Sequence, residues 1–424
     1  MDTPTSSTTL PATRRHDLDW VRVCAFGLLV LYHVGMYYVT WDWHVNSPFA
    51  SHALEPAMML TAPWRLSLLF LVSGVATAFL LARARRQAEA GGGRVRFLGN
   101  RSWRLLVPLL FGMAVVVVPQ SYYEVVEKLP GGYHEGFLAF WGRYLRGDQD
   151  FCGPGGCLVL PTWNHLWFLA YLWVYTVALW LLWRLGRPLL ERATTVLQRA
   201  LSGWGLLLWP ALALALARLL LVGHFGSTHA LVDDWYNHVQ YFGVFLLGFL
   251  VARSAGFWDA AERLRWPALL AWLATWVALA GYMYAYADSD PPEALRTAMR
   301  LAWGVDQWCA IVAVLGFARR LAPGDGPQLR YLVPAVFPVY ILHQTVTVVA
   351  AHNLRAVALH PALEGPLLVV LTFATCFAAY EVIRRVPPLR PLFGLQYRER
   401  PVPPATDQAG MACSTTSCTA APPR

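Results

Sequence analysis

Charged residues are scarce in this sequence. Only 14% of its 424 residues are Asp, Glu, Lys or Arg, whereas 57% are hydrophobic. A soluble globular protein carries about a quarter charged residues, so this composition argues against a soluble enzyme. It predicts an all-α integral membrane protein whose chain crosses the bilayer many times and contacts membrane lipid.

The excess of positive charge does not indicate nucleic-acid binding. The formal net charge is +9, but the cations cluster in alternate loops between apolar stretches. Such clustering is typical of residues that set the orientation of a membrane protein. We therefore expect no nucleic-acid partner.

Cysteine is also sparse, and the seven cysteines form no metal-ligand array. Cys152 and Cys157 flank Gly-Pro-Gly-Gly in a loop expected outside the cytoplasm, where the pair is either bridged or free. The His- and Asp-rich stretch 224–238 lacks the spacing of a known ligand set. We expect no metal site and no permanently bound cofactor.

The sequence also lacks an internal repeat, a second soluble domain and a small-residue cleavage site after its first apolar run. We therefore divide it into a cytoplasmic N-terminal segment (1–16), a transmembrane domain (17–385) and a cytoplasmic tail (386–424). The tail is rich in Pro, Ala, Ser and Thr, which predicts disorder after about residue 400.

Apolar windows long enough to span a bilayer recur about ten times. The predicted spans are 17–40, 57–82, 102–123, 161–184, 204–223, 236–253, 267–287, 298–318, 332–354 and 365–385. The loops on the side of the N-terminus carry about four times as many Lys and Arg residues as the opposite loops. Because basic loops stay inside, we predict that both termini are cytoplasmic.

Two polar residues lie within the first span, Arg22 and His33. They are 11 positions apart, so on a helix they fall within about 20° of one face and ~16 Å apart along the axis. Ionisable groups at membrane depth are costly, so they indicate a working site. This face offers a cation near one membrane surface and an imidazole deeper in.

Further arginines are expected at the cytoplasmic surface. Arg101 and Arg104 are three positions apart on one helix face, where their guanidinium groups could grip phosphate oxygens. They could also be topology residues only. Asp19 lies three residues before Arg22 and could form a supporting pair with it, and Glu381 lies near the inner end of the last span.

Isolated polar residues lie deeper in the predicted bundle. Ser73 either acts at a site or, with Gly74, lets two helices approach closely. His343 is either a working group or a satisfied histidine of the bundle core. Arg65 and Arg218 are cations that could pair with a carboxylate on a substrate.

The first outer loop contains Trp43, His44 and Asn46. Sugar rings stack on aromatic side chains while their hydroxyl groups seek polar partners, so this loop could bind a glycan. An aromatic belt at the membrane surface is at least as good an explanation for each aromatic residue alone.

Five blocks of this sequence resemble the membrane-bound acyltransferase 3 family in their order, over about residues 15–395. Within it, 43–47 (Trp-His-Val-Asn-Ser) and 380–384 (Tyr-Glu-Val-Ile-Arg) resemble the glucan-biosynthesis C-type branch, which succinylates periplasmic glucans. The five blocks are Arg22-x10-His33, the Leu-Phe-Leu-Val-Ser-Gly of 69–74, the Arg-Ser-Trp-Arg-Leu-Leu-Val-Pro of 101–108, the His-Leu-Trp-Phe-Leu of 165–169 and the Tyr-Ile-Leu-His of 340–343.

The resemblance implies an O-acyltransferase of the bacterial inner membrane. Such an enzyme takes an acyl group from cytoplasmic acyl-CoA and delivers it to a hydroxyl of a periplasmic or cell-surface glucan. It also implies a catalytic role for His33 and donor binding by Arg101 and Arg104. Two acyl groups are possible. The resemblance to the glucan-biosynthesis branch favours succinyl, and the frequency of acetyl transfer in the whole family favours acetyl.

The expected mechanism uses His33 as a general base on the acceptor hydroxyl or, alternatively, as an acyl-carrying intermediate. Arg22 lies along the path of the donor arm, and Ser73, His343 or Trp167 could donate to the oxyanion. A transporter with a proton- or anion-coupled pathway is the alternative from another functional class. The residues assigned to substrate binding are Trp43, His44, Asn46, His165 and Trp167.

Overall fold

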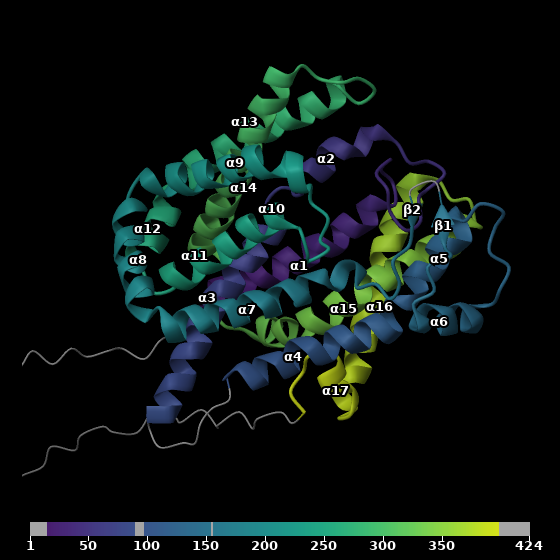
Figure 1. Ribbon diagram of the computed structural model, residues 1–424, viewed down its shortest axis with the longest axis horizontal. Coiled ribbons are helices and arrows are strands. Elements are labelled where there is room, and N and C mark those ends of the chain that lie inside the picture. The colour runs from purple at the N-terminus through teal and green to yellow at the C-terminus, as the bar shows by residue number, and fades with distance from the viewer. Residues whose placement is uncertain (1–14, 90–96, 154–155, 398–424) are drawn as a thin grey trace, which may run out of the picture.

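The computed structural model describes residues 15–89, 97–153 and 156–397 as a helical bundle (Figure 1). Within these residues, nine helical segments are long and apolar enough to cross a membrane, or ten if one bent pair is a single span. The predicted fold class is confirmed. The nine segments are His16–Met36, Arg65–Glu89, Phe97–Lys128, Asn164–Leu185, Gly205–Phe225, Arg265–Ala285, Glu293–Leu321, Pro327–Arg355 and Pro361–Arg385.

Several of these segments are single helices, and two contain a tighter or wider turn. The single helices are α1 (His16–Met36), α3 (Arg65–Glu89), α9 (Gly205–Phe225), α13 (Arg265–Ala285), α14 (Glu293–Leu321), α15 (Pro327–Arg355) and α16 (Pro361–Arg385). The third segment joins α4 (Phe97–Phe111), the π-turn η2 (Gly112–Val116) and α5 (Val118–Lys128). The fourth joins the 3-10 turn η3 (Asn164–Leu166) and α7 (Trp167–Leu185).

Shorter elements complete the described chain. They are η1 (His52–Leu54), α2 (Glu55–Met59), α6 (Phe137–Arg146), α8 (Arg187–Ala200), α10 (Trp235–Asn237), η4 (His238–Phe242), α11 (Gly243–Val251), α12 (Ala255–Arg263) and α17 (Leu389–Leu392). The strands β1 (Cys152–Gly153) and β2 (Gly156–Cys157) form an antiparallel pair.

Two predicted spans differ from the structure in their course. The stretch 57–82 is not one helix, because α2 ends at Met59 and α3 begins only at Arg65. The sixth span, 236–253, is part of the bent pair, in which Trp235–Val251 meets Ala255–Arg263 at 113°. The predicted N-terminal segment and the predicted disorder after residue 400 lie almost wholly outside the described residues.

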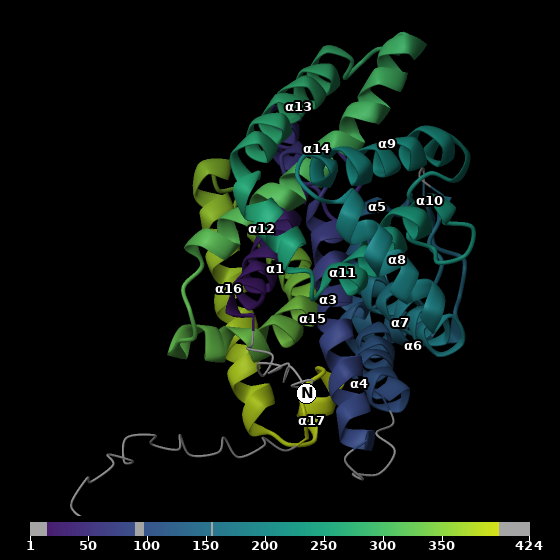
Figure 2. The same cartoon turned by 90° about the vertical axis from the view of Figure 1, so that its left-hand side faces the viewer.

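Helix α1 lies in the interior of the bundle, where it packs against α3, α14, α15 and α16 (Figures 1 and 2). One side of α1 is buried through Leu18, Val21, Ala25, Leu29 and Val30. Helix α13, at the edge of the bundle, keeps large apolar side chains exposed, as a lipid-facing helix does. The helix that carries Arg22 and His33 is therefore held in place from several sides.

Helices α3 and α11 cross at very close range because each contributes a glycine to the contact. A Cβ on Gly74 would overlap the carbonyl of Phe245, and a Cβ on Gly248 would overlap the carbonyl of Leu71. Small residues allow such approach in membrane helices. The close-packing interpretation of the Ser73-Gly74 pair accordingly holds for Gly74.

One end of the bundle is formed by the start of α1, the turn between α14 and α15, and the end of α16. At this end, the start of α1 meets the turn between α14 and α15, where His16 Nδ1 lies 4.0 Å from Asp325 Oδ1. There the hydroxyl of Tyr331 donates to Glu381 at 2.8 Å, which joins the start of α15 to the end of α16. That this end faces the cytoplasm remains a prediction from the charge of the loops.

The opposite end is built from the first loop, α5, α6 and the β-hairpin. Lys128 binds Asp42 at 2.5 Å, which ties the end of α5 to the first loop. Cys152 and Cys157 are joined by a disulfide across the hairpin, so the bridged alternative is confirmed.

Candidate functional site

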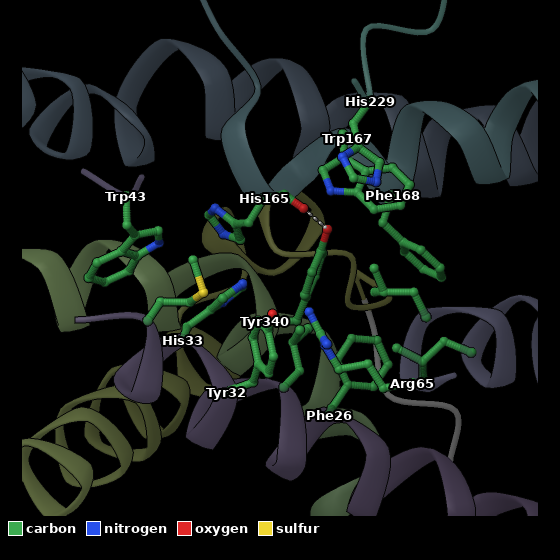
Figure 3. A pocket seen from close by; sticks show the side chains of 14 residues that line it. Phe26, Tyr32, His33, Trp43, Arg65, His165, Trp167, Phe168, His229 and Tyr340 are labelled. Atoms are coloured by element: carbon green, nitrogen blue, oxygen red, sulfur yellow. Dashed lines mark hydrogen bonds between the residues drawn. The ribbon is translucent and has the colours of Figure 1, made fainter. Parts of the chain in front are cut away.

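A cavity of about 240 Å³ lies beside the second half of α1 (Figure 3). Its walls come from α1, α3, η3, α7, α15, the loop after α1 and the loop before α10. Helical spacing explains the contribution of α1, because every third or fourth residue returns to the same face. The side chains that line it are Phe26, Leu29, Tyr32, His33, Met36, Trp43, Arg65, Leu66, Leu69, His165, Trp167, Phe168, His229 and Tyr340.

His33 is bonded to a second imidazole behind the pocket. Its Nδ1 lies 2.7 Å from Nε2 of His343, and the two rings stack with centroids 4.9 Å apart. His343 is fully buried, and its Nδ1 lies 2.6 Å from the carbonyl oxygen of Tyr340. The structure thus brings together His33 and His343, which are both predicted site residues.

These contacts fix which nitrogens carry protons. A carbonyl only accepts, so Nδ1 of His343 must carry the proton that it donates to Tyr340. Nε2 of neutral His343 is then an acceptor, and Nδ1 of His33 must donate to it. We infer that Nε2 of His33 holds a lone pair, as a general base requires.

His165 supports the same wall of the pocket. Its Nε2 lies 3.0 Å from the carbonyl of Ile341, and its own carbonyl accepts a hydrogen bond of 2.6 Å from Tyr340 (Figure 3). Its Nδ1 lies 3.4 Å from the buried amide of Gln120. Gln120 also accepts from Gln344 at 3.1 Å, so a network of buried amides holds α5 against α15.

Arg65 is a buried cation within the pocket wall. It is only 7% exposed, and its Cζ lies 3.3 Å from the centroid of the Tyr32 ring. Its Nε and Nη1 atoms have no hydrogen-bond partner among the described residues. Arg218 lies outside the pocket lining, where it donates to Tyr236 at 2.8 Å and covers the ring of Trp303, although its buried Nε also has no partner among the described residues.

His229 covers the pocket from the loop before α10. Its ring stacks on Trp167 with centroids 4.0 Å apart, and its buried Nε2 has no partner in the described chain. Burial lowers the pKa of His229 to about 4, so the ring is neutral at pH 7. Asp234 fixes this loop by accepting from the amide of His229 at 3.1 Å.

The stretch 224–238 has a structural explanation that does not involve a metal. The carboxylate of Asp234 accepts from the hydroxyl of Tyr171 and from Asn237 at 2.8 Å. His238 Nε2 contacts the carbonyl of Leu231 at 2.7 Å. Over the residues that the structure describes, no group of three or more His, Cys, Asp or Glu side chains could hold a metal ion.

Three arginines predicted from the sequence lie close together toward the start of α1, at least one helical turn from the pocket lining. Arg22 binds Asp19 at 2.9 Å on α1. Arg101 and Arg104 on α4 lie close enough to Arg22 for their charges to interact. Nε of Arg101 is buried without a partner among the described residues. We call Arg22, Arg101 and Arg104 the arginine cluster.

The pocket lining does not reach the arginine cluster. On α1 it ends at Phe26, which is one turn from Arg22 and packs edge-on against Tyr340 with centroids 5.3 Å apart. The path between the cluster and His33 is therefore occupied by side chains in this structure.

The residues predicted for substrate binding separate into two groups. Trp43, His165 and Trp167 line the pocket, whereas His44 is bonded to Glu124 at 2.6 Å. Asn46 donates to the carbonyls of the loop that carries it, at 3.2 and 3.3 Å. Its side chain therefore shapes the loop.

Two predicted residues lie away from the pocket. Ser73 is absent from its lining and lies two turns along α3 from Arg65, beside the close contact of Gly74. Glu381 is bonded to Tyr331 and Arg384 at the end of α16. Ser73 is therefore not placed to donate to an oxyanion in this pocket, whereas the bond from Tyr331 to Glu381 joins α15 to α16, as a supporting residue does.

Comparisons with known proteins identify relatives of the chain. The acyltransferase 3 family, described as an acyltransferase domain, matches residues 15–381. The chain is similar to the proteins named Glucans biosynthesis protein C of Salmonella paratyphi A and Salmonella agona, each 23% identical over 407 residues. The alignment covers 91% of this chain and 95% of each relative. No solved structure matches the chain.

Proposed function

This chain belongs to the acyltransferase 3 family, and from that membership we propose the reaction that it catalyses. It is a membrane-bound acyltransferase. We propose that it takes an acyl group from cytoplasmic acyl-CoA and transfers it to a glucan hydroxyl on the outer side of a bacterial inner membrane. Membership in a family of enzymes favours transfer over the transport alternative.

The observation that carries this proposal is the hydrogen-bonded chain from His33 through His343 to the carbonyl of Tyr340. It leaves Nε2 of His33 as an acceptor beside a pocket. A neutral sugar hydroxyl is a weak nucleophile, so it needs a base at this position. His33 is therefore the proposed catalytic residue, and His343 is the residue that positions it.

The proposed transfer proceeds through addition and elimination. Nε2 of His33 takes the proton of the acceptor hydroxyl as its oxygen forms a bond to the thioester carbonyl carbon. The tetrahedral adduct then collapses, the carbon–sulfur bond breaks, and the protonated His33 returns its proton to the departing thiolate. The products are an ester on the glucan and free CoA, and the imidazole is regenerated.

The arginine cluster is the proposed binding site for the phosphates of CoA. Guanidinium groups bind phosphate oxygens through paired hydrogen bonds. Arg22 and His33 are separated by about 16 Å along α1, a distance of the same order as the pantetheine arm. Phe26 lies between them and has to move aside for the thioester to reach His33.

A glucan acceptor is favoured by the relatives, whose name places them in glucan biosynthesis. Trp43 and Trp167 both line the pocket, and because His229 already covers one face of Trp167, Trp43 is the aromatic surface on which a sugar ring is proposed to stack. The acyl group is proposed to be succinyl, with acetyl as the alternative that the wider family suggests.

An assay with purified protein tests this function. Labelled acyl-CoA and a β-glucan should yield labelled glucan ester, and His33→Ala should lower the rate by about 10²- to 10⁴-fold because the base is removed. His134→Ala is the matched control, since His134 is exposed and its ring is hydrogen-bonded to the carbonyl of the neighbouring Gly131.

Full activity of His33→Ala would contradict the assignment of the base. Movement of unmodified glucan across a membrane without ester formation would contradict acyl transfer and support a transporter.

A further inference from the structure

Arg65 has no counter-charge in the described part of the protein. It forms no ion pair there, and two of its three guanidinium nitrogens are buried without partners. Burying a cation is costly unless an opposite charge or hydrogen-bond acceptors replace its water. The face of Tyr32 offers partial compensation through its ring electrons but no acceptor lone pair for the N–H groups of those two nitrogens.

The surroundings of Arg65 are those of a binding subsite. It lines the same pocket as His33, together with the apolar side chains of Leu66, Leu69 and Phe168. An apolar wall with one unpaired cation suits a ligand that has a short hydrocarbon chain and an anionic end. The pocket volume of about 240 Å³ limits such a ligand to a short chain.

A second polar group without a partner lines the same pocket. His229 is one of its lining residues, and the buried Nε2 of His229 has no hydrogen-bond partner in the described residues. A neutral imidazole can present an N–H to an anion. His229 therefore adds a second unpartnered polar group to the lining of this pocket.

We propose that Arg65 binds a carboxylate at the far end of the acyl group, so that the enzyme selects the half-thioester of a short dicarboxylic acid. This inference rests on the proposed acyl transfer at His33. Guanidinium groups match carboxylates in charge and in geometry. Arg218, the other cation considered from the sequence, is already bonded to Tyr236 and lies outside the pocket lining.

The first test uses the unaltered protein and two donors of equal chain length. Succinyl-CoA and butyryl-CoA differ in whether the acyl chain ends in a carboxylate or a methyl group. The ratio of their kcat/KM values, with β-glucan as acceptor, should favour succinyl by roughly 10- to 100-fold, the discrimination expected of a charged hydrogen bond. A ratio near one, or one that favours butyryl, overturns the proposal.

The second test changes the cation. Arg65→Gln should lower the succinyl-to-butyryl ratio by roughly 10- to 100-fold, and Arg65→Lys should restore part of it because a cation remains. Arg218→Gln is the matched control and should leave the ratio unchanged. Equal loss of transfer from both donors in Arg65→Gln indicates oxyanion stabilisation or a folding role and overturns the proposal.

The outcome separates this inference from the function on which it rests. If the unaltered protein transfers neither group from CoA, the proposed acyl transfer fails. If it transfers butyryl or acetyl readily but not succinyl, acyl transfer stands and the role of Arg65 is refuted. Where Arg65→Gln does not fold, Arg65→Lys replaces it, and the comparison of donors on the unaltered protein still overturns the proposal if the ratio is near one.

Discussion

The protonation of His33 is set by hydrogen bonds that lie behind the pocket. His343 is the acceptor for His33 because its other nitrogen is committed to the carbonyl of Tyr340. This arrangement orients a base through a neutral imidazole, and within the described chain no carboxylate is bonded to His33. The same type of second partner fixes the tautomer of histidine in many enzymes.

Loss of the acceptor at position 343 should lower the rate of transfer. His343→Leu leaves Nδ1 of His33 without its partner, and an unsatisfied buried group costs about 1–3 kcal/mol, which is roughly 10- to 100-fold in kcat. His343→Gln retains a side-chain oxygen that can accept, so it should recover a large part of kcat. Equal activity of the two variants, at equal thermal stability, argues against a positioning role.

Individual residues differed in how well the sequence predicted them. Arg22 and His33 could be placed on one face because helical geometry relates residues 11 apart. The contact between His33 and His343 joins positions 310 apart in sequence and depends on how α1 packs against α15. Arg65 was recognisable as a cation at depth, but its lack of a partner follows from the surrounding fold.

At the scale of helices, the hydropathy of the sequence located most membrane spans. It did not locate the positions at which a span is broken or bent. The stretch 57–82 is apolar on average, and the break between α2 and α3 lies around Pro63, a local signal that a window average of hydropathy does not register. That break places Arg65 at the first position of α3, beside the pocket. The 113° bend after Val251 is likewise invisible to a window average.

The close crossing of α3 and α11 should make Gly74 intolerant of a side chain. Gly74→Ala forces a methyl group into the carbonyl of Phe245, and overpacking typically costs about 1–3 kcal/mol. The melting temperature in detergent should fall. Gly27→Ala on α1 is the control, since a Cβ there meets nothing within 4 Å. A similar melting temperature for both variants would show that α3 and α11 can separate at no cost.

On the scale of the whole molecule, the arginine cluster and the pocket are two sites linked by α1. The cluster lies near the start of that helix and His33 near its end, and α1 packs against α3, α14, α15 and α16 (Figure 2). Phosphate binding is thus proposed at the arginine cluster and acyl transfer at His33, at two different depths in the membrane. The sequence predicted both groups of residues, but it could not predict that Phe26 and Tyr340 fill the space between them.

Removing charge from the arginine cluster should weaken donor binding more than it slows chemistry. The double variant Arg101→Ala and Arg104→Ala should raise the KM for acyl-CoA by tenfold or more, on the order of two lost charged hydrogen bonds, with a smaller change in kcat. Arg192→Ala with Arg199→Ala removes the same charge from exposed positions on α8. A fall in kcat at unchanged KM would contradict donor binding by the cluster.

The most direct test of transfer through this bundle uses sealed proteoliposomes in which the protein has one orientation. Acyl-CoA is supplied on the side of the arginine cluster, and the glucan is enclosed on the side of the first outer loop. Labelled ester should form when the two substrates lie on opposite faces, and should not form with His33→Ala. Ester that forms only when both substrates share one face contradicts the proposal that the acyl group crosses the membrane through this pocket.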